Sequence, residues 1–275
     1  MNYLEFDFII SPIEPAREIL IAELGEINFE SFVDKANGLL AYIPKEDWSS
    51  SALEHLFILK NENFQITWSV KEIEQQNWNA EWEKNFHPIE INETCRIRAP
   101  FHPIKNVSYE IVIEPKMSFG TGHHETTHMM LQLLLEEELK NKVVLDMGCG
   151  TGVLGILSEM KGAKAVDAID IDEWCVENTI ENAERNKCQR INVGLGDVSS
   201  LKDSKYDIII ANINRNILLE DIPVYVSCLR KNGILLLSGF YLSDLDAIST
   251  KCKAQKLRFE KNLLKNNWVA AKYVH

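Results

Sequence analysis

The chain has 275 residues, 45% of them hydrophobic and 25% charged, which is an ordinary globular composition and enough length for one large domain and one small one. No stretch reaches the roughly 18 consecutive apolar residues of a membrane span, and the N-terminus lacks the basic region and apolar core of a signal peptide, so we expect a cytoplasmic protein. The net charge of −12 argues against a broad nucleic-acid surface, which needs a basic face, and suits a basic or neutral partner.

The first 73 residues predict a small separate domain. Strands are expected at 3–10, 29–33, 39–43 and 64–73, and helices at 15–25 and 48–59. Pro15 near the start and Gly25 just past the end delimit the first helix, and Asp47 is placed to cap the second. The order β-α-β-β-α-β is the ferredoxin-like arrangement. Because this α+β domain shows no catalytic cluster, we interpret residues 1–73 as a substrate-recognition module.

Residues 74–88 predict a linker helix. Trp78, Trp82 and Phe86 recur at helical spacing, so one side of the helix should pack while the polar side faces water. His87-Pro88 ends it.

Residues 89–275 predict a larger α/β domain with a Rossmann-like fold. Strands are expected at 89–98, 109–114, 142–146, 164–170, 190–195, 206–211, 233–238, 256–263 and 267–274, and helices in the second half of 116–135 and at 152–161, 173–186, 215–230 and 242–252. Strands that alternate with helices imply a mostly parallel sheet with helices covering both of its faces. Asn266-Asn267 can turn the last two strands into a hairpin, so an antiparallel last strand is expected.

The stretch from Val143 to Gly155 carries the clearest ligand signal. An apolar strand ends in Asp146, glycines follow at alternate positions, and a helix begins, which brings free N–H groups to a tight turn. Gly150 to Gly155 matches the G-x-G-x-x-G of dinucleotide-binding proteins, whereas Asp146-x-Gly148-x-Gly150-x-Gly152 matches the turn of methyltransferases that use S-adenosylmethionine. Asp170, at the end of the next strand, suits both cofactors because its carboxylate can accept hydrogen bonds from both ribose hydroxyls.

Further features favour the methyl donor. Asp146 precedes the first glycine, where a carboxylate would repel a pyrophosphate but could help hold a methionine ammonium. Asp197 follows the third strand, where a methyltransferase contacts adenine. Asn212 ends the fourth strand, at the carboxyl edge where open α/β sheets place their ligands. Thr126 and Thr127 lie in the first turn of the helix after a Gly-rich loop, where hydroxyls and free N–H groups can face a ligand.

A competing zinc-peptidase interpretation rests on His124-Glu125-Thr126-Thr127-His128, which matches H-E-x-x-H. Gly120 and Gly122 lie directly upstream, so the motif begins a helix instead of lying inside one. Leu131 and Leu134 occupy the glycine and third histidine positions of the longer form of the motif. The six cysteines are scattered without a C-x-x-C pair, so we expect free thiols and no metal site.

The Gly-rich loop carries a specific resemblance. Ser118-Phe119-Gly120-Thr121-Gly122 through Thr126-Thr127 is similar to the A-F-G-T-G-T-H-P-T-T loop of the bacterial methyltransferases that act on the large-subunit ribosomal protein numbered eleven. His123 and Glu125 depart from this pattern, because the family usually has Thr and Pro there.

The rest of the chain resembles the same family. Leu145 to Gly152 resembles its D-x-G-C-G-[ST]-G turn, Ile169 to Asp172 its D-I-D strand end, and Ala211 to Ile213 its A-N-I segment. Residues 78–88 resemble its linker.

The resemblance implies a class I methyltransferase domain with S-adenosylmethionine as its cofactor. By that resemblance Thr127, Gly148, Asp170 and Asn212 contact the cofactor. The implied reaction adds methyl groups, up to trimethylation, to amines of ribosomal protein eleven, on lysine side chains and the N-terminal amine, while the small domain holds this partner and the linker lets it reorient.

The expected cofactor-binding set is completed from the motifs. Its members are Thr126, Thr127, Asp146, Gly148, Gly150, Asp170, Asp197 and Asn212. Asn212 is also the expected catalytic residue, because its side-chain oxygen or backbone carbonyl can orient the neutral amine. We expect a monomer that needs no metal.

Other functions stay open on the residues alone. One is a methyltransferase for another protein or small-molecule amine; Asn212-Ile213-Asn214-Arg215 lacks the N-P-P-Y pattern of amide- and adenine-methylating enzymes. The others are a nicotinamide oxidoreductase, a zinc peptidase through His124 and His128, and a non-catalytic binding module.

Overall fold

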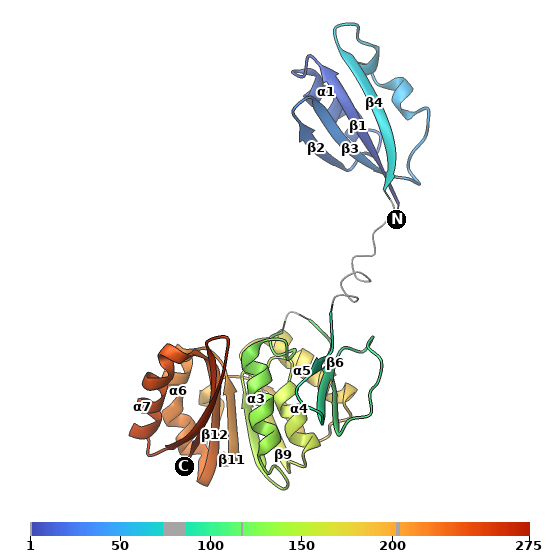
Figure 1. The fold of residues 1–275 in the computed structure, drawn as a ribbon. Coiled ribbons are helices and arrows are strands. Elements are labelled where there is room, and N and C mark those ends of the chain that lie inside the picture. Colours follow the sequence, from blue (N-terminus) through green and yellow to red (C-terminus); the bar gives the residue numbers. More distant parts are fainter. Residues whose placement is uncertain (1, 74–85, 117, 202–203) are drawn as a thin grey trace. The chain divides into compact units, whose positions relative to one another are not determined.

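The computed structural model describes residues 2–73, 86–116, 118–201 and 204–275. The chain divides into two compact units, Met1–Lys84 and Asn85–His275 (Figure 1). The linker helix expected at 74–88 falls almost entirely on residues 74–85, which lie outside the described residues. Among the described residues, no helix is long and apolar enough to cross a membrane.

In its described residues, 2–73, the N-terminal unit is a four-stranded antiparallel sheet with one α-helix. Its elements are β1 (Tyr3–Ser11), α1 (Ala16–Gly25), β2 (Ser31–Lys35), β3 (Gly38–Pro44), two 3-10 turns (Ala52–His55 and Ile58–Lys60) and β4 (Gln65–Ile73). The strand order is β2-β3-β1-β4, as in a ferredoxin-like sheet. Alternate side chains of β1, Phe6 and Phe8 among them, are buried with Leu20 and Leu24 of α1 in one core.

The second helix expected in this unit, at 48–59, is wrong, because two short 3-10 turns occupy the segment. Three serines begin it, and serine side chains compete for the hydrogen bonds that a helix needs; the hydroxyls of Ser49 and Ser51 lie 2.9 Å apart. The Ile58 N–H donates to the Glu23 carboxylate of α1 at 3.2 Å. Contacts with the rest of the unit therefore decide this segment's backbone.

The C-terminal unit is built on a seven-stranded sheet. The strands are β8 (Val143–Met147), β9 (Ala165–Asp170), β10 (Ile191–Leu195), β11 (Tyr206–Asn212), β12 (Leu229–Tyr241), β13 (Arg258–Lys265) and β14 (Trp268–Val274). The helices are α3 (Glu125–Glu136), α4 (Val153–Met160), α5 (Glu173–Arg185), α6 (Arg215–Cys228) and α7 (Leu245–Ala254), with 3-10 turns at Val198–Leu201 and Leu242–Asp244. The strand order is β10-β9-β8-β11-β12-β14-β13, and β14 runs antiparallel to both of its neighbours. The α/β Rossmann-like fold with an antiparallel last strand is confirmed.

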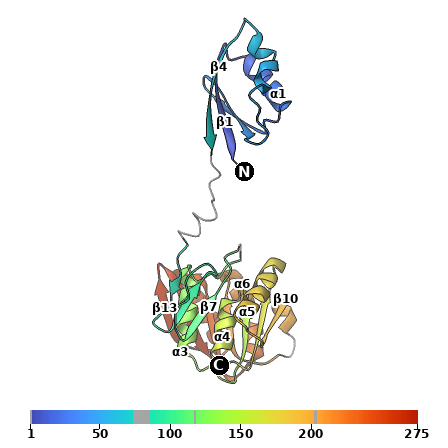
Figure 2. The same cartoon turned by 90° about the vertical axis from the view of Figure 1, so that its right-hand side faces the viewer.

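Both faces of this sheet are buried. Val144 and Ile208 point into a core shared with α3 and α4, whereas Leu145 and Ile209 point into a core shared with α6 and α7. Figure 1 shows α6 and α7 on one side of β11 and β12, with α3 and α4 on the other, and Figure 2 gives the view turned by 90°. The near-continuous apolar strands follow from this double burial.

A separate three-stranded sheet consists of β5 (Ile89–Glu90), β6 (Cys95–Arg98) and β7 (Tyr109–Val112). The single strand expected at 89–98 is therefore wrong. The side-chain oxygen of Asn92 accepts hydrogen bonds from the N–H groups of Thr94 and Cys95, both at 2.9 Å, and this turn reverses the chain.

The position of β8 fixes where a ligand can bind. It lies between β9 and β11. The strands that follow β8 first, β9 and β10, lie on one side of it, and the later strands, from β11 on, lie on its other side. Ligands of open α/β sheets bind outside the carboxyl ends of the strands at such a switch point. Asp146, Asp170 and Asn212 come at or near these strand ends.

Candidate functional site

The glycine turn after β8 brings three chain segments together. Gly148 and Gly150 have φ of +71° and +56°. A Cβ on Gly148 would lie 2.3 Å from Ile213 Cγ2, and one on Gly150 would lie 2.2 Å from the Phe119 carbonyl oxygen. Glycine is therefore needed at both positions, for backbone conformation and for close approach.

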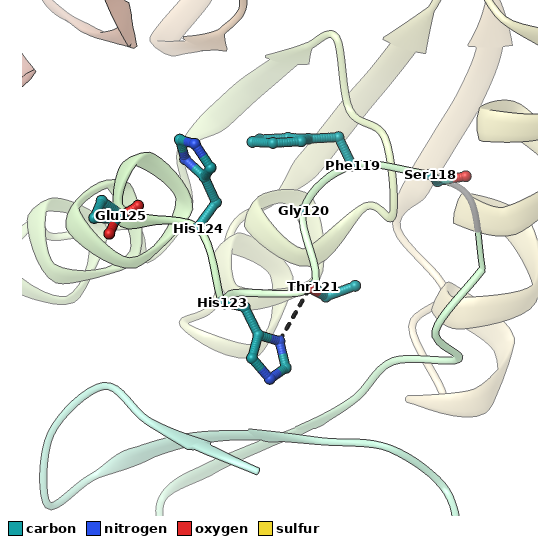
Figure 3. A pocket seen from close by; sticks show the side chains of 7 residues that line it. All are labelled: Ser118, Phe119, Gly120, Thr121, His123, His124 and Glu125. Atoms are coloured by element: carbon teal, nitrogen blue, oxygen red, sulfur yellow. Dashed lines mark hydrogen bonds between the residues drawn. The ribbon is translucent and has the colours of Figure 1, made fainter. Parts of the chain in front are cut away.

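The Gly-rich loop is tied to this turn. The Thr151 N–H donates to the Phe119 carbonyl at 2.9 Å, and the Thr151 hydroxyl donates to the Gly120 carbonyl at 2.7 Å. Figure 3 shows the loop running from Ser118 to Glu125, with His123 turned toward Thr121. The loop therefore covers the turn through backbone contacts that do not depend on His123.

His124 begins α3 as its N-cap. Its Nδ1 accepts a hydrogen bond from the Thr126 N–H at 3.3 Å and lies 2.8 Å from the Thr126 hydroxyl. His124 has φ −72° and ψ 141°, so it is extended and does not share a helix face with His128. The geometry of the H-E-x-x-H motif is thus that of a helix cap and not of a zinc pair.

A cavity of about 420 Å³ opens at the carboxyl ends of β8, β9 and β11. That volume lies within the range of small-molecule sites. Its lining includes five of the expected site residues, namely Gly148, Gly150, Asp170, Asp197 and Asn212. Thr126, Thr127 and Asp146 lie outside the lining.

Four aspartates line this cavity, and two of them, Asp170 and Asp197, come from neighbouring strand ends. Asp170 accepts hydrogen bonds from the N–H groups of Gly150 at 2.9 Å and Asp172 at 3.1 Å, which hold it against the glycine turn. Asp197 accepts from the Ser199 hydroxyl at 2.6 Å and from its N–H at 2.8 Å. These bonds from Ser199 lower the pKa of Asp197, so it is ionised at neutral pH. Both are fixed acceptors for a hydroxyl- or amine-bearing ligand.

Asn212 links the cavity to the Gly-rich loop. Its Nδ2 donates to the hydroxyl of the buried Thr127 at 3.3 Å. Its Oδ1 is buried and has no hydrogen-bond partner among the described residues. An unpaired buried acceptor costs about 1–3 kcal/mol, so this atom calls for a donor from a ligand.

Asp146 is turned away from the cavity. It is 1% exposed, and its carboxylate accepts a hydrogen bond from the Gly155 N–H of α4 at 2.9 Å. Burial raises the pKa of Asp146 to about 7, and the charge of Asp170 adds to the rise. Asp146 therefore joins the end of β8 to the start of α4. Direct contact between Asp146 and a cofactor stays a prediction.

Other lining residues were not expected from the sequence. They include Phe119, Ile171, Trp174, Cys175, Ile213 and Ile217. Ile171 directly follows the Asp170 strand end and Trp174 lies in the first turn of α5, and closeness to Asp170 was the available signal. Phe119 gives no such signal, because its place in the lining depends on contacts with Thr151.

The site suits the methyl donor that the motifs predicted. In the described part of the chain, the one group of three metal-ligand side chains close enough to share an ion is Asp170, Asp172 and Cys175, which belongs to this same cavity. A glycine turn, two carboxylates and an unpaired amide oxygen match a cofactor with ribose hydroxyls and an amine donor beside it. The fold and this site define a class I methyltransferase.

Comparison with known proteins identifies the family. The model of the family described as ribosomal protein L11 methyltransferase (PrmA) matches residues 17–275. A protein named ribosomal protein L11 methyltransferase from Phocaeicola vulgatus is 46% identical over 100% of this chain and 99% of its own length. One of the same name from Porphyromonas gingivalis is 45% identical, covering 99% and 98%. The chain belongs to the ribosomal protein L11 methyltransferase family.

A solved structure agrees with this assignment. The ribosomal protein L11 methylase from Lactobacillus delbrueckii subsp. bulgaricus has a TM-score of 0.64 and 27% identity, covering 68% of this chain and 98% of that one. The family resemblance and the S-adenosylmethionine cofactor expected from the sequence are confirmed. The family assignment replaces the dinucleotide-binding interpretation of the glycine turn and the zinc-peptidase interpretation of the H-E-x-x-H motif.

Asp170→Ala should weaken binding of S-adenosylmethionine at least about tenfold, as loss of a charge-assisted hydrogen-bond acceptor implies. Isothermal titration calorimetry measures the affinity. Asp246→Ala removes an equal charge from the exposed surface of α7 and should leave the affinity as it is. Equal affinities for wild type and Asp170→Ala would contradict the role of this carboxylate.

Asp146→Asn should change how stability depends on pH. A carboxyl whose pKa is higher in the folded protein binds more protons when folded, so its ionisation costs stability as the pH rises from about 4 through about 7. Wild type should lose roughly 2–4 kcal/mol relative to the variant across this window. Urea denaturation at both ends of the window measures this, with exposed Asp246→Asn as the control. Parallel curves for wild type and Asp146→Asn would refute the raised pKa.

Proposed function

We propose that this protein transfers methyl groups from S-adenosylmethionine to lysine side chains of ribosomal protein L11. The observation that carries the proposal is the Oδ1 of Asn212, a buried acceptor without a partner that lies on a residue lining the cofactor cavity. An amine N–H is the donor that completes it. The names of the full-length relatives give the protein that carries the amine.

Asn212 is suited to orient a neutral amine. S-adenosylmethionine supplies a methyl group on a positively charged sulfur, which makes that carbon electrophilic. The amide oxygen accepts one N–H and so fixes the direction of the nitrogen lone pair. The hydrogen bond to Thr127 holds the amide plane, which lowers the entropy lost when the acceptor arrives.

The cavity wall favours the neutral form of the acceptor. A lysine has a pKa near ~10.4 in water and must lose its proton before its nitrogen can react. Ile213 and Met147 contribute apolar surface to the cavity that Asn212 lines. Removing water from around an ammonium lowers its pKa, so these side chains promote deprotonation without a dedicated base.

We assign Asp170 to the two ribose hydroxyls of the cofactor and Asp197 to its adenine. Both carboxylates line the cavity, which supports this assignment. Gly148 and Gly150 let the backbone come close to the cofactor. Thr127 acts through Asn212, and Thr126 through the helix cap.

The N-terminal unit serves to hold the protein substrate. Residues 1–73 contain 13 Asp and Glu against 5 Lys and Arg, so they carry −8 of the chain's net charge of −12. Such a concentration of negative charge attracts a basic partner and orients its approach. The described part of this unit has a core of its own, which makes it a separate docking module.

Incubating the enzyme with ribosomal protein L11 and S-adenosylmethionine should raise the mass of L11 by whole methylene units, and peptide mapping should place them on lysines. Asn212→Ala should slow the reaction roughly 10- to 100-fold, because the acceptor that orients the amine is lost. Asn216→Ala, an exposed neighbour on α6, should keep full activity. No mass increase with the wild-type enzyme would sink the proposal.

A truncated chain that starts at Asn85 should bind S-adenosylmethionine with unchanged affinity but lose methylation of L11, since the cofactor site lies wholly in the C-terminal unit. Mass spectrometry gives the activity and calorimetry the affinity. In the full chain, added salt should raise the KM for L11, because screening weakens the attraction between the partners. Full activity of the truncated chain would show that recognition lies elsewhere.

A further inference from the structure

A row of four aromatic rings leads away from the cofactor cavity. Ring centroids lie 5.1 Å apart for Phe119 and His124, 4.9 Å for His124 and Trp268, and 4.1 Å for Trp268 and Tyr241. The rings come from the Gly-rich loop, the start of β14 and the end of β12. Phe119 is 51% exposed and Tyr241 is 44% exposed, so this aromatic row offers ring surface to a ligand.

The aromatic row lies on the acceptor side of the site. Phe119 lines the cofactor cavity. Tyr241 ends β12, which pairs with β11, and Asn212 at the end of β11 is paired with Ser238 of β12. Asp170 ends β9 and Asp197 follows β10, on the other side of β8. The row therefore runs from the cavity toward β12 and β14, whereas Asp170 and Asp197 lie toward β9 and β10.

A second cavity of about 480 Å³ lies beside the row and is lined by Ser118, Phe119, Gly120, Thr121, His123, His124 and Glu125. In Figure 3 the rings of Phe119 and His124 lie on one side of the loop, while His123 points to the other. Phe119 lines both cavities, so the two adjoin at this ring, and we call the second one the approach.

One carboxylate stands at the rim of this approach. Glu125 accepts a hydrogen bond from Asn266 Nδ2 at 2.7 Å, and Asn266 lies in the turn between β13 and β14, two residues before Trp268. This hydrogen bond lowers the pKa of Glu125, which keeps the side chain charged. The approach thus combines ring faces with a fixed negative charge.

Ring faces and a carboxylate together select a cation that carries alkyl groups. A methylated ammonium keeps its positive charge but loses an N–H donor with each methyl, so hydrogen-bond acceptors hold it less well after each transfer. The face of an aromatic ring attracts the charge and accommodates the methyl groups. A site with several ring faces and a single unpaired acceptor can keep its ligand through successive methylations.

We propose that the aromatic row, with Glu125 at its rim, is the binding site for the methyl-accepting lysine side chain and retains it as methyl groups accumulate. The proposal rests on the proposed function for the identity of the amine. It assigns a specificity role to the four rings and to Glu125.

Full-length variants test the row through the KM for L11 and the proportions of mono-, di- and trimethylated lysine, both read by mass spectrometry. Tyr241→Leu and Glu125→Gln should each raise the KM about fivefold, as loss of one cation–π or charge contact implies, and shift products toward fewer methyl groups. Tyr241→Phe keeps the ring and should resemble wild type. Affinity for S-adenosylmethionine should stay unchanged throughout.

Phe259→Leu is the matched control. Phe259 is 42% exposed, and it packs against Tyr273 at the end of the β13–β14 hairpin opposite to Trp268. This variant should change neither the KM nor the product proportions. If Tyr241→Leu and Glu125→Gln also match wild type, the row has no part in acceptor binding, while the proposed function stands.

A direct titration tests the row even if L11 is not methylated. The probe is Nε-trimethyllysine amide, compared with its uncharged tert-butyl isostere, and the readout is the indole N–H NMR signal of Trp268, assigned with Trp268→Phe. The charged probe should shift this signal and the isostere should not. Absence of a shift, or equal shifts by both probes, would overturn the proposal. Failure of L11 methylation with a positive titration would instead count against the proposed function alone.

Discussion

The close approach of three chain segments at the glycine turn is the constraint on which the rest of the structure depends. Gly148 packs against Ile213, and Gly150 packs against the backbone of Phe119, both at distances that exclude a Cβ. These contacts join the end of β11 and the Gly-rich loop to the end of β8. They also place Phe119, which lines both cavities, against the glycine turn, while Asn212 is bonded to Thr127 of α3.

Features with short-range causes could be predicted from the sequence. The glycine turn, the acid at the end of β9 and the hairpin at Asn266 and Asn267, which have φ of +48° and +69°, all depend on a few neighbouring residues. The segment 48–59 shows the limit, because its serines and its contact with Glu23 outweigh a helical pattern. The direction of Asp146 and the place of Phe119 could not be predicted, since partners distant in the sequence set both.

Asp146 and Asp170 are the same residue type, but their positions give them different partners. Both end neighbouring parallel strands, but Asp146 turns into the start of α4, whereas Asp170 faces the cavity. Burial raises the pKa of Asp146, and the charge of Asp170 adds to the rise.

The two sides of the site differ in how completely their polar groups are paired. On the cofactor side, Asp170 and Asp197 already accept hydrogen bonds from backbone or hydroxyl donors, so they are rigid before a ligand arrives. On the acceptor side, Asn212 Oδ1 has no partner among the described residues, and ring faces replace further acceptors. If the site had a second buried acceptor, a ligand that loses an N–H at each turnover would leave that acceptor without a donor. With one acceptor flanked by aromatic rings, only that single oxygen is left without a donor when the last N–H is lost, and the ring faces hold the methylated cation at that stage.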